Sequence, residues 1–292
     1  MALIRHSARV AVLAGTAVLA GCLAVLSGSA QAGEGTDRMA GSLAQVTGAG
    51  QLVDLELVLA VDASSSVSAE EFDLQMRGFA DAFRDPAVAA AIRATGDLGI
   101  AIAMIQWSDN RRQHVAIDWT HLTTADTTAD FASTIDRTPR FLDGGGTAIG
   151  GAIEFASRAI ARNAFQGVRK VIDISGDGRA NQGAQPSKLR DLAVAQGITI
   201  NGLAILNEDS SVDGYYRTSV IGGTGAFVMT ANNYEDFAAA MLEKLIKEIG
   251  SVPVADRPAP EPAPGKRPQL AQAWTQPAGG PAAQGGGLGP GY

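Results

Sequence analysis

The chain of 292 residues has little of several residue types that mark common functional classes. A single Cys excludes a disulfide framework and a zinc site built on cysteines. Three His leave little for a His-rich metal site or a His-centred catalytic triad. Aromatic residues make up only 5%, which disfavours platforms that stack nucleic-acid bases. A net charge of −7 also argues against nucleic acid, because phosphate binding needs a basic surface.

The N-terminus has the pattern of an export signal. Residues 1–9 are basic, residues 10–26 are uncharged and mostly apolar, and small residues follow as far as Ala32. This order predicts a signal peptide over residues 1–32, and the apolar run is short for a membrane span. The segment Leu19-Ala20-Gly21-Cys22 also resembles a bacterial lipobox, so a lipoprotein signal ending at Cys22 is the alternative. We therefore expect a periplasmic or secreted protein, or a lipoprotein of the inner or outer membrane.

Composition divides the rest of the chain into three parts. Residues 33–50 are rich in Gly, Ala and Ser, which predicts a flexible tether. Residues 251–292 hold nine of the twelve prolines and eight glycines, which predicts a disordered Pro/Gly-rich tail. Between them, residues 51–250 are numerous enough for one domain.

Strand and helix patterns alternate within residues 51–250. Strands are expected at 55–61, 98–107, 115–119, 168–174, 198–206 and 226–229. Helices are expected at 68–83, after Pro86, and at 125–135, 148–161, 186–195, 213–221 and 234–249. The second and third strands form a hairpin, whereas helices separate the others and favour parallel pairing. The pattern predicts an α/β fold with a doubly wound, mostly parallel six-stranded sheet, one antiparallel edge strand and helices on both faces.

Oxygen-bearing side chains follow strands whose carboxyl ends should meet at one edge of this sheet. Asp62, Ser64 and Ser66 follow the first strand. Thr147 begins a helix after a glycine run, and Asp177 follows the strand at 168–174. Hard oxygen donors without thiolate or imidazole favour Mg²⁺, with Mn²⁺ or Ca²⁺ as alternatives. We therefore expect a metal site made of these five residues.

These motifs resemble a known site. Asp62-x-Ser64-x-Ser66, then Thr147, then Asp177-Gly178 resemble the metal-ion-dependent adhesion site, or MIDAS, of von Willebrand factor type A domains. The resemblance covers about residues 52–250 and implies their Rossmann-like fold. Within that superfamily the chain is most similar to a bacterial exported family of unassigned function. The matching segments are residues 62–67, 172–178, 199–205 and 215–217.

The resemblance implies a role for each ligand. Ser64 and Ser66 would bind the cation directly, and Asp62 would act mainly through water. Thr147 would bind directly when a partner is bound and through water otherwise. Asp177 would act through water or by contacting a side chain that binds the ion. A Glu or Asp of the partner would fill the sixth position. One departure is the extra glycine in Ser175-Gly176-Asp177-Gly178, because many such domains have Ser-Asp-Gly or Thr-Asp-Gly. This glycine can displace Asp177.

The predicted function is divalent-cation-dependent protein binding by a monomer, with a protein ligand that presents Asp or Glu. The alternative is a structural domain of the cell envelope without metal, in which Asp62 is a helix cap and the serines form a turn. A metal-dependent hydrolase is less well supported. The chain has no G-x-S-x-G elbow, no P-loop and no His near a candidate Ser. We expect no enzymatic activity, no nucleic-acid partner, and membrane contact only through a lipid on Cys22.

Overall fold

The computed structural model describes residues 50–250. The predicted signal peptide, the tether up to residue 49 and the predicted tail therefore lie outside the described residues. The strands are β1 (Gln51–Asp62), β2 (Ile100–Trp107), β3 (Gln113–Leu122), β4 (Phe165–Gly176), β5 (Ile198–Ile205) and β6 (Val228–Ala231). The helices are α1 (Ala69–Arg84), α2 (Pro86–Thr95), α3 (Ala125–Arg137), α4 (Ile149–Arg162), α5 (Pro186–Ala195), α6 (Val212–Tyr215) and α7 (Phe237–Gly250). No helix among the described residues combines the length and the apolar character that crossing a bilayer requires.

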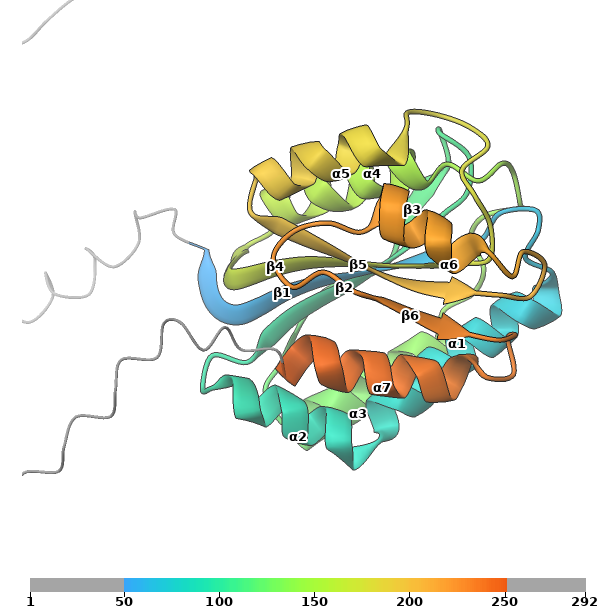
Figure 1. Cartoon of the computed structure of the whole chain (residues 1–292). Helices are drawn as coiled ribbons and strands as arrows, with labels where there is room; N and C mark the ends of the chain where they lie inside the picture. The colour runs from blue at the N-terminus through green and yellow to red at the C-terminus, as the bar shows by residue number, and fades with distance from the viewer. Residues whose placement is uncertain (1–49, 251–292) are drawn as a thin grey trace, which may run out of the picture. The chain divides into compact units, whose positions relative to one another are not determined.

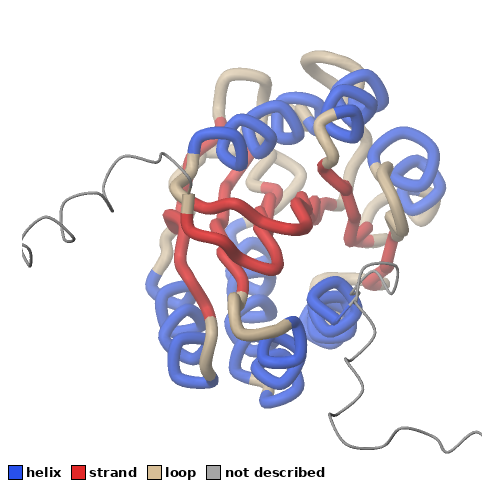
Figure 2. Tube along the Cα trace, turned by 90° about the vertical axis from the view of Figure 1, so that its left-hand side faces the viewer, coloured by secondary structure: helices blue, strands red, loops and turns tan. Residues whose placement is uncertain are grey.

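The six strands form one sheet in the order β3-β2-β1-β4-β5-β6. All neighbouring pairs are parallel except β2 and β3, which are antiparallel, so β3 is the antiparallel edge strand. Helices α1, α2, α3 and α7 cover one face, and α4, α5 and α6 cover the other (Figure 1). Figure 2 shows the same layers after a quarter turn, with the strands between two sets of helices. The predicted fold class is confirmed.

The centre of the sheet is the most deeply buried part of the domain. In β1 the residues from Leu55 to Val61 are all fully buried, because helices cover both faces. On one face, edge-on aromatic pairs join α1 to its neighbours: Phe79 packs against Phe237, and Phe83 against Phe131. On the other face, Trp107 packs in a cluster with α4. Each face of the sheet therefore has its own hydrophobic core.

Many boundaries differ from the expected ones by a few residues, and two of these differences have a clear physical reason. β1 begins at Gln51 rather than at residue 55, because β4 also begins early and the two strands pair from Gln51 and Phe165 onward. The helix expected over 213–221 is α6 followed by a π-helical turn, Tyr216–Val220. In that turn the Ile221 amide donates to the Tyr216 carbonyl, five residues back. Strand pairing and side-chain packing determine these boundaries. Neither of these causes produces a periodic pattern in the sequence.

The start of α1 sets the path of the loop after β1. Ser68 is the N-cap, its side chain accepts a hydrogen bond from the Glu71 amide, and Glu71 in return accepts from the Ser68 amide. These two reciprocal bonds form a capping box, for which Ser68 and Glu71 have the required spacing in the sequence. The loop of residues 62–68, which we call the serine loop, is thus held between the end of β1 and a capped helix (right-hand side of Figure 1).

Candidate metal centre

Asp62 is the last residue of β1 and is completely buried. Its Oδ1 atom accepts a hydrogen bond of 2.7 Å from the Ser64 amide. Its main-chain carbonyl accepts one of 3.2 Å from Nε2 of Gln75, on α1. Its Oδ2 atom has no hydrogen-bond partner among the described residues. A buried carboxylate oxygen without a donor is costly, so this atom needs a proton or a cation.

The electrostatics of Asp62 point the same way. Burial, with a smaller contribution from the charge of Asp177, raises the pKa of Asp62 to about 7. Hydrogen bonds from Ser64 and the charge of Arg140 lower the pKa of Asp62 but do not offset burial. The two carboxyl groups of Asp62 and Asp177 thus repel each other in a site of low dielectric constant. A divalent cation beside them would relieve this repulsion, so the residues present fit a metal ion.

Hydroxyl groups connect the serine loop to Asp177. The Oγ atoms of Ser64 and Ser66 lie 3.1 Å apart. Ser66 donates to Oδ1 of Asp177 over 2.9 Å, and the Tyr234 hydroxyl donates to Oδ2 of Asp177 over 3.0 Å. Asp177 is only 2% exposed. The structure therefore brings four of the five predicted ligands into one cluster.

Thr147 lies at the same edge of the sheet, in the loop of residues 138–148, which we call the threonine loop. Its amide donates to Oδ1 of Asn181 over 2.8 Å, and its carbonyl accepts from the Asn181 amide over 3.0 Å. A methyl group on Gly178 would lie 4.0 Å from its Oγ1 atom. No hydrogen bond joins the Thr147 side chain to the other four candidates within residues 50–250. It borders the cluster from the next loop.

Ser65 joins the serine loop to the threonine loop. The Ser65 amide donates to the Gly145 carbonyl over 2.9 Å, and the Gly145 amide donates to Ser65 Oγ over 2.8 Å. Gly145 has φ of 120°, a conformation that side chains with a Cβ rarely adopt. The glycine run before Thr147 is therefore needed for this contact between the loops.

The extra glycine of the β4 loop does not separate Asp177 from the serines. Gly176 ends β4, and Asp177 still accepts the hydrogen bond from Ser66. A methyl group on Gly176 would lie 2.8 Å from Oδ2 of Asp62 and 2.8 Å from the hydroxyl of Tyr216. Gly176 thus leaves room beside the unpaired oxygen of Asp62.

Sequence reasoning missed four residues that hold this site. Gln75, Arg140, Asn181 and Tyr234 each hydrogen-bond to a predicted ligand or to its loop. Their side chains belong to no motif, and Gln75 and Tyr234 lie within or beside helices that pack on the sheet. Asn181, four residues after Asp177, is the one whose closeness to a motif could have drawn attention.

Carboxylates and hydroxyls alone make up the donor set. Among residues 50–250, no group of three or more His, Cys, Asp or Glu side chains is placed to hold a metal ion. The candidate site has two carboxylates, with Ser and Thr hydroxyls as the other donors, which suits a hard ion such as Mg²⁺ or Mn²⁺.

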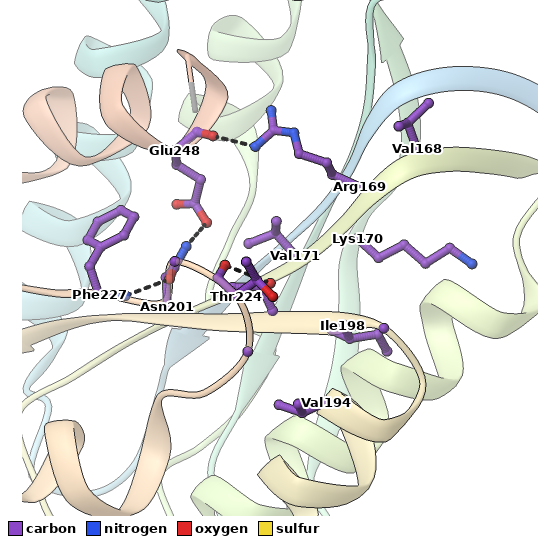
Figure 3. Close-up of a pocket in the computed structure, with 14 residues that line it drawn as sticks. Val168, Arg169, Lys170, Val171, Val194, Ile198, Asn201, Thr224, Phe227 and Glu248 are labelled. Atoms are coloured by element: carbon purple, nitrogen blue, oxygen red, sulfur yellow. Dashed lines mark hydrogen bonds between the residues drawn. The ribbon is translucent and has the colours of Figure 1, made fainter. Parts of the chain in front are cut away.

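A pocket of about 390 Å³ opens at the other end of the parallel strands, where they begin (Figure 3). It lies between the amino-terminal halves of β4 and β5, the glycine-containing turn at 223–225 and the end of α7. Arg169 and Phe227 line it, and none of the five candidate ligands does. The hollow and the oxygen cluster are therefore separate features of the domain.

Comparison with known proteins identifies a family. A model for a family described as "protein of unknown function (DUF1194)" matches residues 52–253. A search of the curated proteins gave no match. Among solved structures, the chain is similar to proximal thread matrix protein 1 from the mussel byssus with a zinc-occupied MIDAS motif, at 21% identity and a TM-score of 0.48. That alignment covers 70% of this chain and 46% of the mussel chain, so this chain spans less than half of that protein.

Two bacterial structures are also similar. The von Willebrand factor domain of the type V pili tip protein Mfa5 from Porphyromonas gingivalis is 14% identical over 68% of this chain and 95% of that chain, with a TM-score of 0.48. A von Willebrand factor type A protein from Catenulispora acidiphila is 18% identical over 68% of this chain and 43% of that chain, with a TM-score of 0.46. The sheet order and the hairpin agree with the α/β fold that the resemblance to von Willebrand factor type A domains implies, and the chain belongs to the DUF1194 family.

Proposed function

We propose that this protein is an exported, divalent-cation-dependent protein-binding module. Asp62, Ser64, Ser66, Thr147 and Asp177 would hold a Mg²⁺ or Mn²⁺ ion. The observation that carries the proposal is the hydrogen-bonded cluster of Ser64, Ser66 and Asp177 beside the unpaired, fully buried Oδ2 atom of Asp62. Loops that lie more than a hundred residues apart in the sequence build this cluster.

The contacts of Asp62, Ser66 and Tyr234 support a role for each of them in the site. Asp62 uses Oδ1 to fix the turn through the Ser64 amide, which leaves Oδ2 for the ion or its water. The Ser66 hydroxyl donates a hydrogen bond to Asp177, so the lone pairs of its oxygen remain for coordination of the ion. The bond from Tyr234 holds the other oxygen of Asp177 and orients that carboxylate.

The partner follows from the donor set. Mg²⁺ prefers six oxygen ligands, and side chains that bind it directly or through water leave a position that a carboxylate of another protein can take. When bound, the ion would supply the positive charge that attracts this carboxylate. The role of the chain is then to bind an acidic side chain, without a catalytic nucleophile or base. The N-terminal signal pattern supports a place for this binding in the periplasm or outside the cell.

The first test compares thermal unfolding in EDTA with unfolding in Mg²⁺ or Mn²⁺. A cation at about 100 times its Kd adds about 2.7 kcal/mol by mass action, which is about 5–10 °C in Tm for a domain of this size. Asp62→Asn keeps the acceptor for the Ser64 amide and removes the charge, so it should abolish the shift and still fold in EDTA. Asp130→Asn, at an exposed position on α3, should keep the shift. An unchanged wild-type Tm at millimolar Mg²⁺ and Mn²⁺ would favour the structural domain without metal.

The second test concerns the partner. Protein captured from envelope extract in Mn²⁺ should be released by EDTA and absent when the bait is Ser66→Ala. Esterification of the carboxyl groups in the extract should also prevent capture, because the proposed contact is a carboxylate. Capture that survives both EDTA and Ser66→Ala would contradict this role of the site.

A further inference from the structure

Arg140, in the threonine loop, contacts the serine loop, and all five of its N–H groups donate hydrogen bonds. Nε donates to the carbonyl of Leu142 over 3.0 Å, within its own loop. The other four bonds, of 2.9–3.2 Å, go to main-chain carbonyls of the serine loop. These carbonyls belong to Ala63, Ser64, Val67 and Ser68.

The binding mode of this guanidinium is unusual in having only carbonyl partners. Arginine usually pairs with a carboxylate, yet Arg140 forms no ion pair within residues 50–250. Its side chain also stacks over the ring of Phe72, 5.3 Å from the centroid, and is half-buried. Ring and carbonyls together fix the position of the guanidinium on the serine loop.

These bonds determine the shape of the serine loop. Carbonyls at both ends of the loop turn toward one planar group, so the chain between them curls around it. Within this curl the Val67 amide donates to the Ser64 carbonyl, and the Ser65 amide bonds to Gly145. The positive charge also lies close enough to lower the pKa of Asp62. Arg140 thus gives the loop both its curvature and a positive charge.

We propose that Arg140 is a positioning residue that shapes the serine loop for metal binding. The loop is then preformed, and its affinity for the cation depends on the guanidinium. Because Arg140 and Thr147 belong to the same loop, the two ligand-bearing loops act as one unit. This inference rests on the proposed metal site.

The test is Arg140→Lys, because lysine keeps the charge but has three rotatable donors instead of a rigid fork of five. Mn²⁺ affinity is measured by calorimetry, and Tm is measured in EDTA. We expect Arg140→Lys to bind Mn²⁺ at least about tenfold more weakly, the usual effect of losing a group that orients metal ligands. Arg137→Lys, at an exposed position on α3, should bind Mn²⁺ like the wild type.

The outcomes separate this inference from the proposed function. If the wild-type protein binds no Mn²⁺, the proposed function fails and the inference fails with it. If the wild type binds Mn²⁺ and Arg140→Lys matches its affinity within about twofold, only the inference fails, even where the Tm in EDTA falls. That last pattern would show a purely structural role for Arg140.

A measurement on the wild type covers the case in which the variant does not fold. In EDTA, the amides of Ser65 and Val67 should already exchange slowly with solvent, because the curled loop bonds both. Adding Mn²⁺ should add little protection at these positions. Fast exchange in EDTA that slows only with Mn²⁺ would mean that the ion shapes the loop, and would overturn the inference.

Discussion

At the scale of single residues, the site depends on empty space as much as on ligands. Gly176 has an extended conformation that any residue can adopt, so its importance is steric. A methyl group there would approach Oδ2 of Asp62 and the hydroxyl of Tyr216 to 2.8 Å, closer than Cβ atoms normally come. The hydroxyl of Tyr216 is itself buried and has no hydrogen-bond partner among the described residues. Because Gly176 has no side chain, the space beside these two polar atoms stays free.

We therefore expect Gly176→Ala to lower the free energy of unfolding by about 1–3 kcal/mol, the usual range for overpacking a buried site. It should also weaken binding of Mn²⁺, because Asp62 must move. Gly214→Ala is the matched control, since a methyl group there meets no atom within 4 Å. Urea unfolding and Mn²⁺ titration measure both effects. Equal stability and affinity for the two variants would contradict this steric role.

At the scale of elements, buried charges join α7 to the sheet. Nζ of Lys244, on α7, lies 2.6 Å from Oδ1 of Asp173, on β4, and 2.7 Å from Oε2 of Glu248. The side-chain Nδ2 of Asn201, on β5, donates to the other oxygen of Glu248 over 2.9 Å. The contact between Lys244 and Asp173 is an ion pair, and neither oxygen of Asp173 accepts a well-formed hydrogen bond among the described residues. The helix is thus placed by one ammonium that two carboxylates share.

Removing that ammonium should be costly. Lys244→Met keeps the length of the side chain but leaves two buried carboxyl groups without a cation. We expect a loss of about 3–5 kcal/mol in the free energy of unfolding, as is typical when one partner of a buried ion pair is removed. Lys188→Met, at an exposed position on α5, should change it little. Urea unfolding checks both, and a loss below about 1 kcal/mol for Lys244→Met would show that the ion pair does not hold α7.

At the scale of the whole molecule, buried carboxyl groups link stability to pH. Burial, opposed by the charge of Lys244 and reinforced by the charge of Glu248, raises the pKa of Asp173 to about 7. Asp62 has a pKa of about 7 as well. A folded-state pKa above the ordinary 3.8 means that the folded protein binds these protons more tightly than the unfolded chain. This contribution to stability is full below about pH 4 and is lost as the pH rises to about 7.

The metal-free protein should therefore become less stable between pH 4 and pH 7. For each group the slope approaches about 1.4 kcal/mol per pH unit at most. Asp173→Asn removes one of the two groups, so its stability should depend less steeply on pH. Urea unfolding in EDTA at several pH values measures the slope. A wild-type profile that is flat or rises over this range would show that these groups are ionised in the folded state.

Several features of this protein follow from local sequence. Alternating strand and helix patterns predict every strand and helix, because burial on both faces of a parallel sheet makes strands such as 55–61 apolar at nearly every position. The capping box at Ser68 and Glu71 is likewise a matter of neighbouring residues. The candidate ligands could be predicted because strands that run parallel end at the same edge.

Only the tertiary structure decided how those ligands are held. Arg140, Gln75 and Tyr234 reach the site from loops and helices, through side-chain contacts that no spacing rule encodes. The same holds for the unpaired oxygen of Asp62, since its burial depends on helices packed from distant parts of the chain. The sequence by itself determines which residues form each element and which oxygen atoms follow each strand. Packing between elements determines which of these atoms meet, because burial and hydrogen bonding at this edge are properties of the assembled sheet.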